Sequence, residues 1–199
     1  MGDLQNEKHN EGSPIDRVAR LRFDFQRTLQ ASACLLRLSH KRMAYIRLLK
    51  LLYIAEREWL AESGESITGD QAFAMRNGPV LSVTLNLIKG NNPRAGEWDD
   101  FIHSDGYEVV LVADPGRDEL SKGVVAKLTE VCERFRRIDD WSLVNKTHEF
   151  EEWKQNRVGK ASPIPWRDIL AAQNRNDMIA VVEEGEAAQN FIRRTFGRE

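Results

Sequence analysis

The chain has 199 residues, enough for one domain with a substantial core. Hydrophobic residues make up 41% of it and charged residues 30%, an ordinary balance for a globular protein in water. The formal charge of −2 disfavours general nucleic-acid binding. No apolar stretch reaches the ~20 residues that a membrane helix needs. We therefore expect a cytoplasmic protein with no membrane partner, whose two cysteines, Cys34 and Cys132, are buried free thiols.

The N-terminal third of the chain predicts a leader followed by two helices. Residues 1–13 lack apolar periodicity and are predicted to be a disordered leader. The apolar spacing then predicts a helix from Pro14 to Leu36 and, after a break at Ser39–His40, another from Lys41 to Ala61. The apolar surface of this second helix is too wide for a one-sided surface helix. We expect it to be the central helix of the domain.

The middle of the chain predicts two strands and a helix. A short strand is expected from Gln71 to Met75, and Gly78–Pro79 is expected to begin a helix, since proline in a first turn needs no backbone N–H. The polar stretch from Asn91 to Asp105 reads as a surface loop. The β-branched stretch from Tyr107 to Val112 predicts a second strand, which we expect to pair with the first.

The C-terminal part of the chain predicts helices only. The apolar spacing indicates a helix from Ser121 to Arg137, and Asp139 or Asp140 is suited to cap a short one after it. Proline residues precede a helix over Trp166–Ala172, and a final helix is expected at about 177–196.

These elements predict a mainly α fold: one compact multi-helix domain over residues 14–199 with a small antiparallel β-hairpin. The five tryptophans are expected to anchor the core. Trp98, which stands in the polar stretch, would instead mark a binding surface if it were exposed.

No group of residues predicts catalysis, a cofactor or a metal ion. The sequence THEFEEW is similar to a zinc-protease helix, but Glu152 stands where the second histidine is needed. Asp70 follows a glycine in a turn, where an aspartate usually accepts backbone N–H groups. A hydrolase that uses Asp70 and His148 is a minor alternative. We expect a protein that is not an enzyme.

Two features suggest charged partners. The expected helix start at Gly78–Pro79, beside Arg76, is suited to bind an acidic side chain of a partner. The basic run from Lys41 to Lys50 would suit a winged helix-like DNA regulator, but glutamates follow it directly. DNA is therefore a partner that we do not favour.

Two blocks of residues resemble the SocA-like Panacea domain. The first block contains Leu49–Tyr53, Gly64, Ile67–Asp70, Ala74 and Gly78–Val80. The second contains Leu143, Thr147–His148, Trp153, Pro165 and Ile169. The resemblance implies a mainly helical fold with a short hairpin. It also implies an antitoxin of a bacterial or prophage toxin–antitoxin system, which neutralises its cognate protein toxin by direct binding. One member of the family acts as an adaptor that delivers its toxin to an AAA+ protease, so such a protease is an alternative partner.

The candidate site residues lie within the two blocks and, for Arg76, beside the first block. They are Lys50, Tyr53, Asp70, Arg76, Gly78, Pro79, His148 and Trp153. Two roles remain open at this point. Lys50, Asp70, His148 and Trp153 either form a polar network that joins the two blocks, or belong to a surface that faces the partner.

Overall fold

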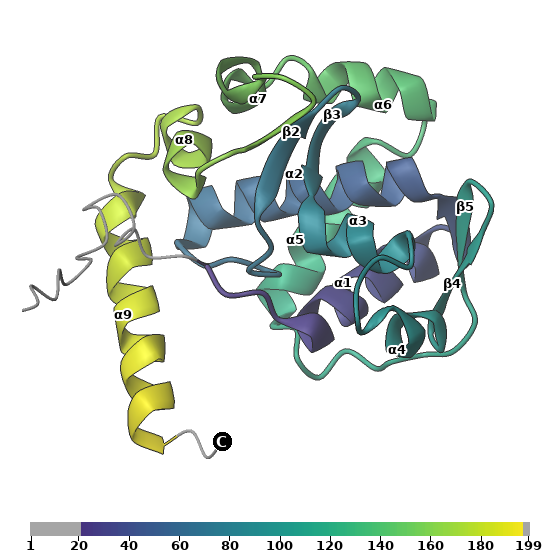
Figure 1. Cartoon of the computed structure of the whole chain (residues 1–199), viewed down its shortest axis with the longest axis horizontal. Helices are drawn as coiled ribbons and strands as arrows, with labels where there is room; N and C mark the ends of the chain where they lie inside the picture. Colours follow the sequence, from purple (N-terminus) through teal and green to yellow (C-terminus); the bar gives the residue numbers. More distant parts are fainter. Residues whose placement is uncertain (1–20, 197–199) are drawn as a thin grey trace, which may run out of the picture.

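The computed structural model describes residues 21–196, so the expected leader at 1–13 lies outside the described residues. Within the described range the chain forms nine helices and two three-stranded antiparallel sheets (Figure 1). The prediction of a mainly α fold with minor β structure is confirmed. Cys34 and Cys132 are buried and free, as expected.

The first described helix, α1, spans Phe25–Leu38 and begins later than predicted. Asp24 caps it, because its carboxylate accepts the N–H of Arg27 at 3.0 Å. The backbone N–H of Asp24 donates to the carbonyl of Thr68 at 2.8 Å, which holds the preceding residues in an extended conformation. The predicted helix is therefore wrong for residues 21–24, and its start at Pro14 lies outside the described range.

The central helix, α2, spans Tyr45–Ser63 and ends at Gly64, whose φ of +74° suits a residue without a side chain. It does not begin at Lys41, because Arg42–Ala44 form strand β1 and pair with strand β5. Helices pack around α2 on several sides (Figure 1), as its wide apolar surface predicts: α1, α5 (Lys122–Arg134), α6 (Asp140–Thr147) and α8 (Trp166–Ala171).

One sheet has the strand order β3-β2-β6. Its strands are Ala72–Met75 (β2), Gly78–Leu81 (β3) and Ala161–Pro163 (β6). The predicted helix start at Gly78–Pro79 is wrong: helix α3 begins four residues later and spans Ser82–Ile88. Pro79 lies opposite Ala74 in β3, an edge strand, where a residue without an N–H is tolerated.

The other sheet has the order β1-β5-β4, with β4 at Ile102–Asp105 and β5 at Glu108–Leu111. The predicted pairing of the two strands is therefore wrong, since β5 pairs with β4 and β1 and not with β2. The expected surface loop also contains helix α4, Ala95–Asp99. Trp98 in that helix is 1% exposed and meets Phe25 edge to face, so it belongs to the core.

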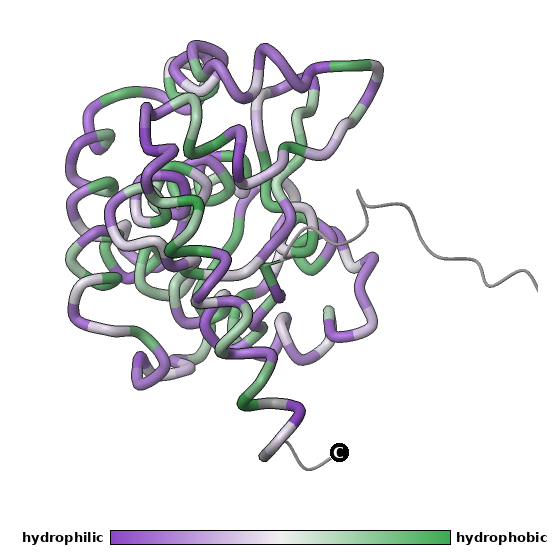
Figure 2. Tube along the Cα trace, turned by 90° about the vertical axis from the view of Figure 1, so that its left-hand side faces the viewer, coloured by the Kyte–Doolittle hydropathy of each residue, from purple (hydrophilic) through white to green (hydrophobic). Residues whose placement is uncertain are grey.

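The C-terminal helices largely follow the sequence pattern. Ser121 caps α5 and Asp139 caps α6. A short helix, α7, spans Glu151–Asn156, and the last helix, α9, spans Met178–Phe196. The C-terminal half of α9 projects beyond the rest of the fold in both views (Figures 1 and 2).

The packing of α2 gives a stability prediction. Leu52 has no exposed surface, so the Leu52→Ala variant should lose about 2–5 kcal/mol of unfolding free energy through the cavity it creates. Val112 is 57% exposed, and Val112→Ala should stay within about 0.5 kcal/mol of the wild type. Urea denaturation of both variants measures the difference. Equal losses would contradict the central position of α2.

Candidate functional site

The two blocks of motif residues meet at the turn between β2 and β3. We call residues 75–78 the hairpin tip. Met75 and Gly78 are the last paired residues of the two strands, and Arg76 and Asn77 between them are exposed. Gly78 has a φ of +88°, a conformation that favours glycine.

Gly78 also lies where three elements come together. A Cβ atom at this position would stand 2.4 Å from Oγ1 of Thr147 and 3.0 Å from Nζ of Lys50. The ring of His148 would be 3.3 Å away. Because glycine has no side chain, the hairpin can rest directly on α2 and α6.

Lys50 projects from α2 beneath the hairpin and has no exposed surface. Its ammonium group donates a hydrogen bond of 2.6 Å to the carbonyl of Pro79. Burial disfavours the charged form and lowers the pKa of Lys50 to about 7. The amine therefore fastens the central helix to β3 at the cost of burying an ionisable group.

Trp153 fastens α7 to the same place. Its indole N–H donates to the carbonyl of Met75 at 3.0 Å, and its ring stacks on His148 with 4.2 Å between centroids. Burial, and then the positive charges of Lys50 and Arg157, lower the pKa of His148. Nε2 of His148 is enclosed without a hydrogen-bond partner among residues 21–196. The cationic form of His148 is thus disfavoured.

Tyr53 belongs to a neighbouring network one turn along α2. Its hydroxyl donates to the buried carboxylate of Glu152 at 3.1 Å, and Arg57 donates to the same oxygen at 2.5 Å. The guanidinium group of Arg57 also lies 4.3 Å from the ring centre of Phe150. Glu152, the residue that breaks the zinc-protease pattern, is therefore an ion-pair partner inside the fold. Sequence reasoning missed both Arg57 and Glu152 as members of the site.

Asp70 lies apart from this cluster, at the opposite end of the hairpin. Its carboxylate accepts the backbone N–H groups of Val83 at 2.9 Å and Thr84 at 2.7 Å, and also the Thr84 hydroxyl. It therefore caps α3 from outside that helix. A helix start at Pro79 was expected to offer free N–H groups to an acidic partner. The helix start lies instead at α3, and its first-turn N–H groups already donate to Asp70.

Three cations surround the hairpin tip. Arg76 is exposed, and because Ala161 pairs with Met75, Lys160 is its neighbour just beyond that pair. The guanidinium carbon of Arg157 lies 5.1 Å from the ring centre of Trp153. Within the described part of the chain, none of these three cations forms an ion pair. We refer to Arg76, Arg157 and Lys160 as the tip cations.

Cations of the basic run that suggested DNA binding form contacts within the fold. Arg42 pairs with Asp105 and Glu108, at 3.1 and 2.5 Å. Arg47 pairs with Asp140 at 2.9 Å and donates to two backbone carbonyls. Lys50 is buried, so Lys41 is the exposed cation of the run that has no ion pair among the described residues, and phosphate binding uses several such cations together.

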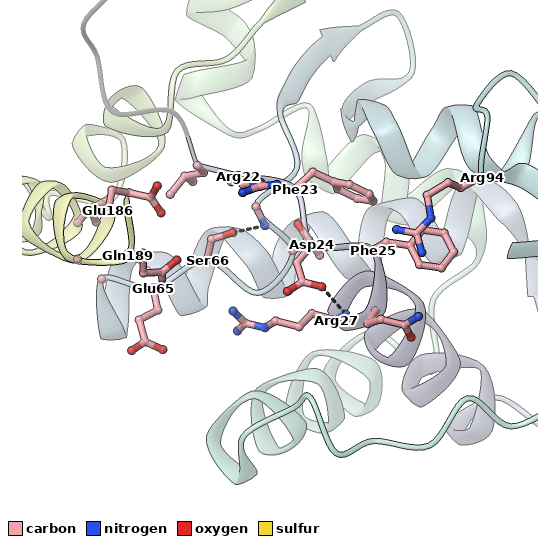
Figure 3. Close-up of a pocket in the computed structure, with 17 residues that line it drawn as sticks. Arg22, Phe23, Asp24, Phe25, Arg27, Glu65, Ser66, Arg94, Glu186 and Gln189 are labelled. Carbon is pink, nitrogen blue, oxygen red and sulfur yellow. Dashed lines mark hydrogen bonds between the residues drawn. The ribbon is translucent and has the colours of Figure 1, made fainter. Parts of the chain in front are cut away.

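A pocket of about 430 Å³ lies between the start of α1, the connection after α2, and α9 (Figure 3). Its lining includes both acids and bases, among them Arg22, Arg27, Glu65 and Glu186. Nothing in the local sequence predicts this pocket, because it forms only where α9 packs beside segments far away in the chain.

Two further properties concern the described residues alone. Among residues 21–196, no three histidine, cysteine or acidic side chains are grouped so that they could hold a metal ion. In the same range, no helix is long and apolar enough to cross a membrane.

The family model of the antitoxin SocA-like, Panacea domain matches residues 48–154. The chain belongs to this family. The match begins in α2, ends in α7 and includes all the candidate site residues, whereas α9 lies outside it. Comparison with curated proteins and with solved structures gave no match. Of the tip cations, Arg76 lies within the match, whereas Arg157 and Lys160 follow its end.

The close packing of α2 and α6 against Gly78 predicts that a methyl group added at this position lowers the free energy of unfolding. Gly106 also has a positive φ, of +62°, but a Cβ atom there would meet nothing within 4 Å. Both Gly→Ala changes strain the backbone, so Gly78→Ala should cost about 1–3 kcal/mol more than Gly106→Ala because it also overpacks the site. Thermal and urea denaturation measure the difference. Equal costs would mean that α2 and α6 do not lie against the hairpin.

The buried amine predicts a pH dependence. Between pH about 7 and the ordinary pKa of 10.5, the unfolded chain holds a proton that folded Lys50 has released. The free energy of unfolding should therefore rise with pH in this window, by up to about 1.4 kcal/mol per pH unit. Below pH about 7 both states are protonated, and this contribution no longer changes.

Lys50→Met removes that titration. The stability of the wild type relative to Lys50→Met should therefore increase from pH about 7 to about 9 in urea denaturation. Lys122 is exposed, and the Lys122→Met variant should follow the wild-type profile. A difference between wild type and Lys50→Met that is constant with pH would show that the amine keeps its proton when the chain folds.

Proposed function

We propose that the protein is an antitoxin that neutralises a protein toxin by binding it directly. Membership of the antitoxin SocA-like Panacea family is the observation that carries this proposal. The family supports the antitoxin role, and the geometry of the hairpin tip suggests how the toxin is held.

The tip cations are the proposed contact. They form no ion pair within the described chain, and Arg76 and Lys160 follow the Met75–Ala161 pair on facing strands, where like charges repel each other. An acidic patch on the toxin would relieve this repulsion. Arginine is also common among the residues that dominate binding energy at protein interfaces. The toxin surface that binds here should therefore be acidic.

The scaffold beneath the tip supports this assignment. Lys50, Trp153 and Gly78 fix the hairpin through buried contacts, so the tip is ordered before the partner arrives. Binding through a preformed surface avoids the entropy cost of ordering a loop. This favours a role for the motif residues in positioning the tip, with the exposed side chains making the contact.

We also propose that the protein acts without catalysing a reaction. The two side chains considered for hydrolysis lie at opposite ends of the hairpin. The Asp70 carboxylate accepts hydrogen bonds from the first turn of α3, and His148 stacks on Trp153 beside the tip. Neither is placed to activate a nucleophile for the other.

Co-expression with the protein encoded by the neighbouring gene tests the proposal. The wild-type chain should restore growth while the toxin level stays unchanged, whereas an adaptor for a protease would shorten the half-life of the toxin. Growth arrest that persists despite good expression of the chain would rule out the antitoxin role.

Charge reversal tests the contact surface. Arg76→Glu should abolish rescue and leave the melting temperature unchanged, because Arg76 is exposed and makes no ion pair in the described chain. Arg117→Glu makes the same charge change at an exposed site between β5 and α5, and it should still rescue growth. If Arg76→Glu rescued as well as Arg117→Glu, the toxin would have to bind elsewhere.

A further inference from the structure

The sheet with the order β3-β2-β6 has one buried face. Side chains alternate between the two faces along a strand, and residues opposite each other in neighbouring strands share a face. On one face Ala72 is 4% exposed, Ala74 is 2% exposed and Leu81 has no exposed surface. This face belongs to the core, since β2 and β3 cross α2 (Figure 1) and β3 packs against it.

The other face of the same sheet points outward. Phe73 lies opposite Pro163, and Met75 lies opposite Ala161. Phe73 and Met75 are half-buried, whereas Ala161 and Pro163 are exposed. Val80, which lies opposite Phe73 in β3, is 7% exposed and limits the accessible area on that side. We call Phe73, Met75, Ala161 and Pro163 the outer sheet face.

The composition of the outer sheet face is unusual for a surface that only water covers. The solvated face of an antiparallel sheet is normally polar, but all four of these residues are apolar. The next residue on this face before β2 is Gln71, which is exposed and polar. Grouped apolar side chains with a polar rim are typical of a surface that binds another protein.

The outer sheet face continues directly into the tip cations. Met75 precedes Arg76 in the chain, and Ala161 follows Lys160. Val158, a further apolar residue, is 72% exposed and stands between Arg157 and Lys160 in the sequence. The apolar area and the cations therefore form one continuous surface, with the charges at one end. Protein interfaces commonly combine an apolar centre with a charged rim in this way.

The free edge of this sheet disfavours the addition of a further strand. The backbone N–H of Ile164 donates to the carbonyl of Ala72 at 2.8 Å, so the nitrogen of its neighbour Pro163 points away from β2. Proline has no N–H to offer a strand at that edge. A partner would thus cover the outer sheet face with side chains.

We infer, on the basis of the proposed antitoxin function, that the outer sheet face is the apolar part of the toxin-binding surface. The matching surface of the toxin carries an apolar patch bordered on one side by acids. The acids meet the tip cations, and the apolar patch covers Phe73, Met75, Ala161 and Pro163. The cations steer the encounter and fix its register, while the apolar contact slows dissociation.

Calorimetric titration of the full chain with the toxin encoded by the neighbouring gene tests this surface. Ala161→Gln makes an exposed position of the face polar without a change of charge, and it should weaken binding about tenfold. Met75→Gln should act in the same direction. Ala113→Gln makes the same change as Ala161→Gln at an exposed site after β5, and it should bind like the wild type. The melting temperature of Ala161→Gln should match that of Ala113→Gln.

The salt dependence of binding separates the two parts of the surface. The effect of Arg76→Glu should shrink as salt rises from about 0.05 M to about 0.5 M, because salt screens exposed charges. The effect of Ala161→Gln should stay the same over this range, since no charge is altered.

Three results would overturn the inference in distinguishable ways. If Ala161→Gln and Met75→Gln bind like the wild type while Arg76→Glu binds weakly, the toxin contacts the tip alone and the antitoxin proposal stands. A wild type that does not bind the toxin would remove both. A wild-type dimer that sediments as a monomer after Ala161→Gln, with no toxin present, would assign the outer sheet face to a second copy of the chain.

Discussion

The contact of the Gly78 backbone with Lys50 and Thr147 is the constraint on which the rest of the site depends. It leaves no room for a side chain between the hairpin and the two helices beneath it. The Pro79 carbonyl can then accept a hydrogen bond from the Lys50 amine, and the Met75 carbonyl can accept one from the Trp153 indole N–H. A glycine, a buried lysine and a tryptophan far apart in sequence thus define one position for the hairpin tip.

The other end of the hairpin is held by buried carboxylates. Glu56 accepts the backbone N–H groups of Ile67 and Thr68, and Asp70 accepts those at the start of α3. Burial raises the pKa of both acids, and the hydrogen bonds oppose that rise. Since both ends are fixed by buried polar contacts, the exposed side chains at the tip can change with little effect on the fold. Such an arrangement suits a domain that presents a specific surface to a partner.

Sequence reasoning succeeded where local patterns decide the structure. The wide apolar surface of α2 and a cap at Asp139 or Asp140 were both predicted from a few neighbouring residues, and the structure selects Asp139. It failed where residues far away in the sequence decide the structure. Gly78–Pro79 suits a helix start locally, but pairing with β2 draws it into a strand. Of the four residues considered for a network, the structure brings Lys50, His148 and Trp153 to the hairpin tip and leaves Asp70 at the other end. The pairing of Arg57 with Glu152, and the approach of Lys160 to Arg76, depend on register and packing that no local pattern encodes.

Hydrogen–deuterium exchange of the chain, with and without the toxin encoded by the neighbouring gene, tests the central claim most directly. That claim is that the hairpin tip and the tip cations form the toxin-binding surface. Binding should slow exchange at Met75–Gly78 and at 157–160, while the amides of the distant β4–β5 turn exchange at the same rate in both samples. Protection confined to other surfaces, or no protection at all in a mixture at saturating toxin, would contradict the account.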